Sequence, residues 1–282
     1  MARLKFLLAF FSLLIYAAGV AGAYYFWTKY AKLEISVTRQ ITGEATAKRQ
    51  KPDLGKRHFD AAMALLTEGE LVSGRDRLLY LMQYYPESGT FSDAKRVAGE
   101  VNLDLLISQI PHPEKTRHVV RRGEALITIA RRSNTTIDYI MRANGKTTVL
   151  IYPNEELIVY PLNYRVEISL EAGTLTVFDG DNFFKEYKIV NVNLPPEVAG
   201  TVVTTISEKV AWDEDRPMNF TDANYLNCSK WIRTGKIGLF IREYSVERTS
   251  AGAAPLGVMV EKSDMEELFT ILRVGTEVKL VN

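Results

Sequence analysis

The stretch "RHVVRRGEALITIARRSNTTIDYIMRANGKTTVLIYPNEELIVYP" (residues 117–161) has the clearest pattern of secondary structure in the middle of the chain. Its apolar spacing predicts a strand, two short helices and a closing strand, in that order. A turn at Gly123 separates the first strand from the first helix. Thr135 and Asp138 have the spacing of a capping box for the second helix, and the Asn-Gly pair at 144–145 can end it in a left-handed cap.

This stretch resembles the LysM family along its whole length. Residues 119–145 follow the family's opening turn and two helices, and "LIYPNEELIVYP" (150–161) follows its last loop and strand. LysM members bind N-acetylglucosamine-containing glycans, peptidoglycan in bacteria, in a shallow groove between the first turn and the last loop. The resemblance implies these glycan-binding residues: Gly123, Glu124, Ala125 and Leu126 on one side, and Leu150, Ile151, Tyr152 and Pro153 on the other. This chain departs from the family at Glu124-Ala125, where the family usually has Asp-Thr. As an alternative to glycan binding, the segment would only pack on its neighbours.

The N-terminus carries an uncharged run, "FLLAFFSLLIYAAGVAGAYYFW", from Phe6 to Trp27. It is long enough to cross the roughly 30 Å hydrocarbon layer as a helix. Because the aromatic group at 24–27 is typical of a membrane interface, we predict an uncleaved anchor over residues 1–28. The small-residue pattern at 21–23 leaves a cleaved secretory signal as the alternative. The polar and basic residues at 29–57 predict a juxtamembrane linker.

Residues 58–110 have the apolar spacing of three helices, interrupted at Gly69 and again between Pro86 and Gly89. The pattern resembles a tetratricopeptide-like unit. So few helices cannot form a solenoid, because stacked neighbours normally supply the buried faces of such repeats. We therefore expect either a spacer or a docking face for a protein partner at helices 58–109.

From Tyr164 onward the apolar residues alternate, which predicts a mostly-β domain over residues 163–282. Hairpin turns are expected at the Ala-Gly pair at 172–173 and the Asp-Gly pair at 179–180. Further strands are expected at 200–206, 236–242, 256–261 and 275–281. One helix is expected from Ser263, as its N-cap, to Leu272.

This domain resembles the L,D-transpeptidase catalytic-domain family, most closely in "DMEELFTILRVGTEVKLV" (264–281) and more loosely in "YRVEISLEAGTLTVFDGDNFFKEYKIV" (164–190) and "NYLNCSKWI" (224–232). Active members use a cysteine thiolate, a histidine base and an arginine. Counting back from Asp264 without a gap puts Pro255, Gly257 and Met259 at the histidine, cysteine and arginine positions. The family also has a His-Gly pair further upstream, which falls near residues 238–241 and puts Phe240 at that histidine position. A gapped alignment instead sets residues 250–253 against the motif. Both alignments lose the nucleophile and the base.

The chain contains one cysteine, Cys228, and no histidine after His118. Cys228 is therefore the alternative nucleophile, and it would need Lys230, Arg233 or Lys236 to lower the pKa of its thiol. A single cysteine also excludes an intramolecular disulfide and a multi-cysteine metal site, and we expect neither a metal nor a cofactor. With 35 basic and 34 acidic residues, the charge gives no case for nucleic acid.

Together these patterns predict a multidomain α+β protein: a transmembrane helix, a helical tetratricopeptide-like segment, a βααβ LysM domain at 116–162 and a mostly-β L,D-transpeptidase-like domain. We expect a single-pass protein of the bacterial cytoplasmic membrane, held by residues 6–27, with its folded part in the periplasm or cell wall. Its partner would be peptidoglycan. The C-terminal domain would bind or scaffold without catalysis, and the alternative is a divergent active transpeptidase using Cys228.

Overall fold

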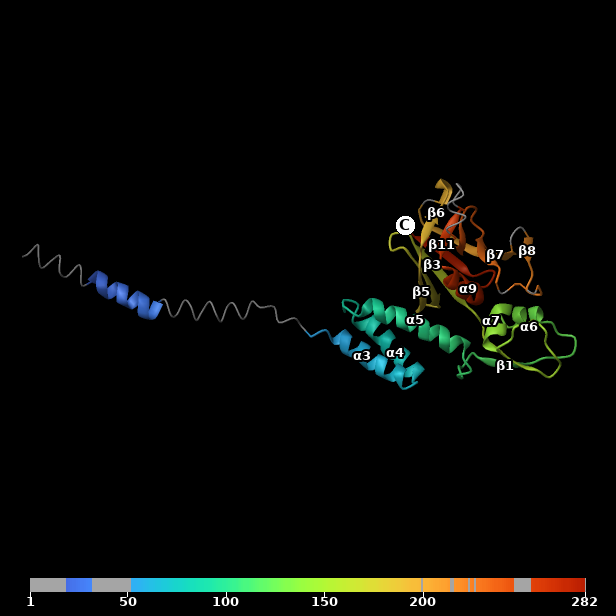
Figure 1. Cartoon of the computed structure of the whole chain (residues 1–282), viewed down its shortest axis with the longest axis horizontal. Helices are drawn as coiled ribbons and strands as arrows, with labels where there is room; N and C mark the ends of the chain where they lie inside the picture. The colour runs from blue at the N-terminus through green and yellow to red at the C-terminus, as the bar shows by residue number, and fades with distance from the viewer. Residues whose placement is uncertain are drawn as a thin grey trace, which may run out of the picture. The chain divides into compact units, whose positions relative to one another are not determined.

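The computed structural model describes residues 19–31, 52–198, 200–213, 216–222, 224–225, 227–245 and 255–281. The chain divides into two units, Met1–Asp53 and Leu54–Asn282, and each is described by itself (Figure 1). In the first unit, residues 19–26 are helical and continue into the π-helical turn η1 (Trp27–Ala31). The predicted anchor and linker lie mostly outside the described residues. Within the described ones, no helix is both long and apolar enough for a membrane span.

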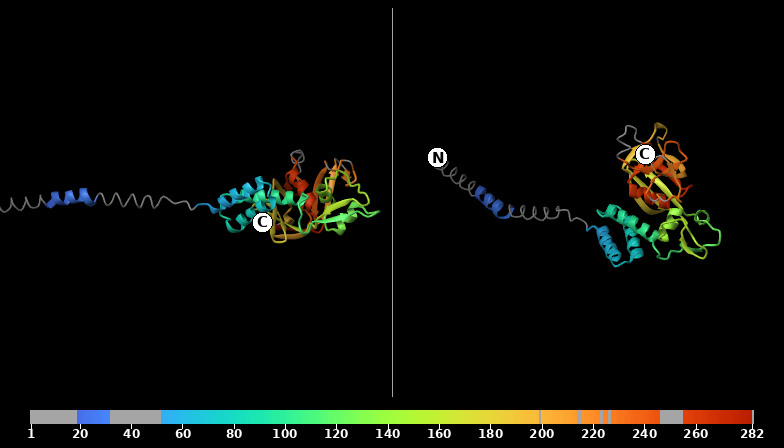
Figure 2. Two further views of the ribbon diagram at one scale, coloured as in Figure 1. Left: turned by 90° about the horizontal axis from the view of Figure 1, so that it is seen from below. Right: turned by 45° about the vertical axis from the view of Figure 1, so that its right-hand side comes forward.

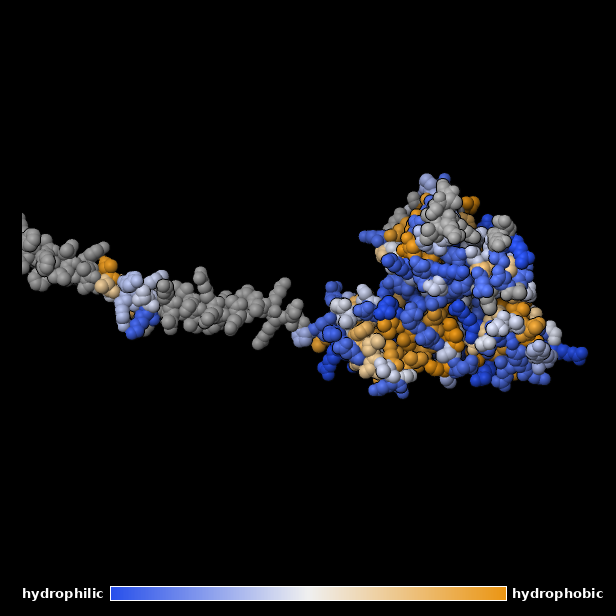
Figure 3. Space-filling model, viewed as in Figure 1, coloured by the Kyte–Doolittle hydropathy of each residue, from blue (hydrophilic) through white to orange (hydrophobic). Residues whose placement is uncertain are grey.

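The second unit begins with the three predicted helices, α3 (Leu54–Thr67), α4 (Leu71–Tyr84) and α5 (Phe91–Ile107). Gly69 adopts a positive φ of 85° between α3 and α4, which explains the break predicted there. The core of the three helices consists of small and medium apolar side chains: Ala62, Leu78, Leu81, Ala94 and Ala98. The views in Figure 2 show the helices side by side, and Figure 3 shows hydrophobic residues exposed over them.

Helix α5 packs against the C-terminal domain, so it is more than a spacer. The amide nitrogen of Asn102 donates to the carbonyl oxygen of Phe184 at 2.7 Å. The ammonium of Lys185, on β5 (Asn182–Lys188), lies 2.8 Å from the Glu100 carboxylate and 2.7 Å from that of Glu267. One face of α5 is thus occupied within this chain, and the tetratricopeptide-like interpretation is not confirmed.

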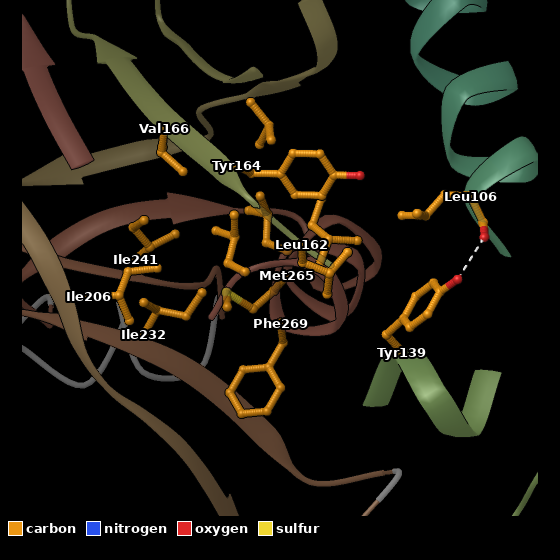
Figure 4. Close-up of a cluster of buried hydrophobic side chains, with 14 of the residues drawn as sticks. Leu106, Tyr139, Leu162, Tyr164, Val166, Ile206, Ile232, Ile241, Met265 and Phe269 are labelled. Carbon is orange, nitrogen blue, oxygen red and sulfur yellow. Dashed lines mark hydrogen bonds between the residues drawn. The ribbon is translucent and has the colours of Figure 1, made fainter. Parts of the chain in front are cut away.

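The predicted βααβ order is confirmed for the middle segment. It comprises β1 (Thr116–Val119), α6 (Leu126–Arg132), α7 (Ile137–Ala143) and β2 (Glu156–Val159), with β1 and β2 antiparallel. We call residues 116–159 the βααβ segment. Its fit against α5 includes Tyr139, whose buried hydroxyl donates to the carbonyl oxygen of Leu106 at 3.1 Å (Figure 4).

The caps of α7 agree with the prediction at one end only. The N-cap is Thr136 and not Thr135, because Thr136 has extended backbone and its hydroxyl oxygen accepts from the Tyr139 amide at 2.9 Å. The Thr135 hydroxyl is buried with no hydrogen-bond partner among the described residues. At the other end Gly145 has a φ of 61°, and the amide of Lys146 donates to the carbonyl oxygen of Met141 at 2.8 Å, as in a Schellman motif.

The C-terminal domain, residues 164–281, contains a strand path in the order β5-β4-β3-β12-β7-β9-β10-β11-β6, with β8 paired to β7. Its strands are β3 (Tyr164–Ser169), β4 (Thr174–Asp179), β6 (Asn191–Asn193), β7 (Val202–Asp213), β8 (Arg216–Met218), β9 (Ser229–Thr234), β10 (Phe240–Glu243), β11 (Gly257–Val260) and β12 (Glu277–Val281), besides β5. Alternate residues of β3 are buried, as the period of two predicts. A short 3-10 helix, η2 (Pro196–Val198), follows β6.

Helix α9 (Lys262–Ile271) closes the core of this domain with Met265, Leu268 and Ile271, all fully buried. Figure 4 shows Met265 and Phe269 among side chains from several strands. The predicted N-cap was wrong: the N-cap is Glu261, two residues before Ser263, and no side chain caps the helix. Ser263 therefore lies inside the first turn.

Candidate functional site

The two loops predicted to form the glycan groove are joined by backbone hydrogen bonds at the end of β1. The amide of Val120 donates to the carbonyl oxygen of Glu155 at 2.9 Å, and the amide of Asn154 donates back to Val120 at 2.8 Å. Gly123 makes the opening turn with a φ of 82°, a conformation that favours glycine. The opening turn and the last loop are therefore held side by side.

Of the eight candidate residues, Gly123, Ala125, Leu150, Tyr152 and Pro153 are exposed, whereas Leu126 is buried in the core. Leu150 and Tyr152 expose 63% and 67% of their surface, which is high for large apolar and aromatic side chains. Such side chains can cover the faces of sugar rings, while exposed backbone groups can bond to acetamido groups. Ile151 is half-buried and packs on the core, so it supports the loop from below.

Glu124 is turned back onto its own loop. Its carboxylate accepts from the Arg121 amide at 2.8 Å, from the His118 ring at 2.9 Å and from the Arg132 guanidinium at 3.0 Å. The Arg121 amide and then the His118 hydrogen bond lower the pKa of Glu124 to about 2. Glu124 therefore fixes the opening turn and has no oxygen free of such contacts to offer a sugar. The sequence did not reveal this role, although the Glu-for-Asp departure marks the position.

Glu155 fixes the last loop in a similar way. Its carboxylate accepts from the Lys146 ammonium at 2.5 Å and from the Tyr152 amide at 2.9 Å. These contacts lower the pKa of Glu155, the Lys146 hydrogen bond contributing most. Both loops are thus anchored by a carboxylate that bonds a backbone amide and a cation. The sequence did not indicate this role for Glu155, because nothing in the local pattern distinguishes it from any exposed glutamate.

A hollow of about 590 Å³ lies between α6–α7 and the C-terminal domain. Asp138 is at its wall, where it accepts from the Tyr225 hydroxyl at 3.1 Å and lies 3.7 Å from the Lys209 ammonium. Lys209 also donates to the carbonyl oxygen of Phe269, and burial lowers its pKa. These contacts, with the Thr136 hydroxyl donating to Thr270 at 2.5 Å, attach the βααβ segment to the C-terminal domain.

Two of the predicted catalytic positions lie together in the C-terminal domain. Phe240 begins β10 and Gly257 begins β11, and these strands run parallel as neighbours. A Cβ atom on Gly257 would be 2.6 Å from the Phe240 carbonyl oxygen. Met259 is fully buried two residues further along β11, and the carbonyl oxygen of Pro255 accepts from the side-chain amide of Asn193 at 3.4 Å. The gapped alignment at residues 250–253 lies outside the described residues.

Cys228 lies apart from these positions. It precedes β9, whose residue Arg233 pairs with Phe240, so the backbone of Cys228 lies five residues, roughly 17 Å along the strand, from the residue that pairs with Phe240. The thiol is 2% exposed and donates to the carbonyl oxygen of Tyr225 at 3.0 Å. Burial raises its pKa despite the opposing charge of Lys230, whose ammonium lies 2.6 Å from Glu266. The thiol therefore has the environment of a packing residue. Among the described residues, no group of three or more metal-ligating side chains is present.

Comparison with solved structures finds low-level similarity to L,D-transpeptidases. L,D-transpeptidase 1 from Mycobacterium tuberculosis is 12% identical with a TM-score of 0.30, over 42% of this chain and 62% of that one. The enzyme from Stackebrandtia nassauensis is 15% identical with a TM-score of 0.31, over 43% and 56%. A mutant of the Enterococcus faecium enzyme is 16% identical with a TM-score of 0.30, over 42% and 49%. This chain thus spans about half to three fifths of these proteins.

Comparison with curated proteins finds no similar sequence. Comparison with protein families finds a match to the model described as "LysM domain" over residues 118–159. These bounds agree within two residues with the start of β1 and coincide with the end of β2. The chain therefore carries, at residues 118–159, a segment that matches the LysM domain.

Proposed function

We propose that this protein binds peptidoglycan through the βααβ segment and that the C-terminal domain is a binding or scaffolding module without transpeptidase activity. The observation that carries the first part is the pair of anchored loops beside Val120, which present Ala125, Leu150 and Tyr152 to solvent. The glycan would lie between the turn at Gly123 and the loop at 150–153.

The second part rests on the residues at the candidate catalytic positions. Phe240 and Gly257 have no group that attacks a carbonyl or takes up a proton, and the chain has no histidine beyond His118 to act as the base. The alternative, a divergent enzyme using Cys228, requires a reactive thiolate. Burial of that thiol and its raised pKa argue against it.

We further propose that the uncharged run from Phe6 to Trp27 holds the protein at a bacterial membrane, with the folded part outside the cytoplasm. Within the described part of this run, Tyr24, Tyr25, Phe26 and Trp27 are each more than half exposed. Such an aromatic group suits a membrane interface. Measuring the mass of the native N-terminus would distinguish an anchor from a cleaved signal.

A protein partner at the helices remains part of the proposal, restricted to α3 and α4. Tyr80 and Tyr84 are 42% and 57% exposed and lie in one aromatic cluster with His58 and Tyr85. Exposed tyrosines of this kind are enriched at protein interfaces. A pull-down with Tyr80→Ser/Tyr84→Ser should lose a partner that the parent protein recovers, and equal recovery would remove this part.

The test of the main proposal has two measurements on the same purified full-length protein. Co-sedimentation with purified sacculi measures peptidoglycan binding, and mass spectrometry after incubation with a carbapenem measures acylation. We expect binding to sacculi and no mass increase. An acyl adduct would overturn the non-catalytic role, and a Cys228→Ser variant would then show whether that thiol carries it.

A further inference from the structure

The carboxylates of the βααβ segment are all occupied. The segment contains four acidic residues. Glu124 bonds His118, Arg132 and a backbone amide, Asp138 bonds Tyr225, Glu155 bonds Lys146, and Glu156 lies 3.3 Å from Arg117. Asp138 also lies 3.7 Å from the Lys209 ammonium. Each of the four carboxylates therefore has a cationic side chain beside it, and none is free to meet a ligand.

Two arginines beside the opening turn, unlike these carboxylates, have side chains without a partner among the described residues. Arg121 and Arg122 are both exposed and directly precede Gly123. Within the part of the chain that the structure describes, neither guanidinium has an ion pair or a hydrogen bond. The backbone beneath them is fixed, because the Arg121 amide donates to the Glu124 carboxylate at 2.8 Å. Two guanidinium groups are thus carried on an anchored turn.

These arginines line a shallow hollow of about 630 Å³ at the end of β1. Pro153 and Asn154, from the last loop, form another part of its wall. Pro153 is also one of the candidate glycan-binding residues, so the hollow and the candidate groove share this residue. A strand bound in the groove would pass beside the two guanidinium groups.

We propose that Arg121 and Arg122 form an anionic subsite that binds a carboxylate or phosphate carried by the same glycan strand whose N-acetylated sugars occupy the groove. This inference rests on the proposed function and adds a charge requirement to it. Guanidinium groups bond both carboxylate and phosphate oxygens with paired N–H donors, so the shared chemistry is an oxyanion. The subsite would favour an acidic strand over a neutral one.

The size of the effect follows from the exposure of the two side chains. Exposed ion pairs contribute little each, so removing two should weaken binding of an acidic strand about 3- to 30-fold. Because exposed charges are screened within about 10 Å at 0.1 M ionic strength, the preference should shrink as salt is added. Binding of a neutral strand should not depend on either arginine.

The experiment is calorimetric titration of the full-length protein with three tetrasaccharides. One is the neutral N-acetylglucosamine tetramer. The second alternates N-acetylglucosamine with N-acetylmuramic acid, without peptide, and so carries carboxylates. The third is the tetramer phosphorylated at its 6-hydroxyls. Each is measured with the parent protein, with Arg121→Ala/Arg122→Ala, and with Arg131→Ala/Arg142→Ala. The last variant removes the same charge from exposed arginines of the segment that do not line the hollow.

We expect the parent protein to bind at least one acidic strand more tightly than the neutral one. This excess affinity should be lost in Arg121→Ala/Arg122→Ala and kept in Arg131→Ala/Arg142→Ala. The strand that shows the excess identifies carboxylate or phosphate as the ligand group. No excess, or an equal loss in both variants, overturns the subsite. Failure of the neutral tetramer to bind counts against the proposed groove instead, so the two failures are distinguishable.

Discussion

Phe240 and Gly257 lie against each other at the start of two parallel strands, and there is no room between them for a side chain. A Cβ atom on Gly257 would come within 2.6 Å of the Phe240 carbonyl oxygen and 2.9 Å of its Cβ atom. The φ of Gly257 is 127°, a value that residues other than glycine rarely adopt. In the ungapped alignment this is the nucleophile's position, and any residue larger than glycine would strain the backbone and displace Phe240.

Replacing Gly257 by alanine should therefore destabilise the fold by about 2–4 kcal/mol, from backbone strain plus the clash with Phe240. The measurement is the midpoint of urea unfolding. Gly275→Ala is the matched control, because Gly275 has a φ of 91° but open space around it. Gly275→Ala should lose only about 1–2 kcal/mol of stability, because it introduces backbone strain without a steric clash. Equal losses in the two variants would show that Phe240 can move aside.

Cys228 should react slowly in the native protein. Its burial and raised pKa predict a rate with a thiol reagent at neutral pH at least about 100-fold below that of the unfolded chain. The rate should rise with denaturant as the fold opens. Rapid labelling of the native protein at pH 7 would contradict this and would support the divergent-enzyme alternative.

Glu124 should make the stability of the protein depend on acid pH. Its folded-state pKa of about 2 is below the unfolded value near 4.3, so its contribution is present above that value and is lost as the pH falls toward 2. The free energy of unfolding should thus be higher for the parent than for Glu124→Gln at pH 7, and the two values should converge near pH 2. Glu156→Gln, in an exposed pair with Arg117, should change stability by less than about 0.5 kcal/mol. If the difference in stability between the parent and Glu124→Gln stays constant with pH, the lowered pKa of Glu124 is contradicted.

The Tyr139 hydroxyl joins the βααβ segment to α5, so Tyr139→Phe should cost about 1–2 kcal/mol by leaving the Leu106 carbonyl oxygen without that donor. Thermal or urea unfolding measures this. Tyr152→Phe removes the same hydroxyl from a side chain that is 67% exposed and should be neutral within about 0.5 kcal/mol. If both variants are neutral, the Tyr139 hydrogen bond does not help to hold the two parts together.

The sequence predicted the elements of the fold better than their contacts. Apolar spacing located α3, α4 and α5, the βααβ order and the alternation in β3, because periodicity reflects which face each element buries. The N-caps of α7 and α9 were wrong by one residue or more. Which threonine turns its hydroxyl toward an amide depends on the packing of Thr136 against Thr270, 134 positions away.

Only part of the candidate site could be predicted from the sequence. The resemblance to LysM indicated which loops meet, and the exposure of Leu150 and Tyr152 agrees with a binding surface. It did not reveal that Leu126 faces the core or that Glu124 bonds its own turn. The separation of Cys228 from Phe240 also follows from strand pairing, which a single sequence does not give.

In the proposed function, the loops at Gly123 and 150–153 bind peptidoglycan. Its most direct test is co-sedimentation of the full-length protein with purified sacculi, comparing the parent with Leu150→Ala/Tyr152→Ala. Both side chains are more than half exposed, so the variant should fold normally. We predict that the parent sediments with sacculi and that the variant loses most of this binding, at least about 10-fold in affinity. Equal sedimentation of the two proteins, or none of the parent, would contradict binding of peptidoglycan at these loops.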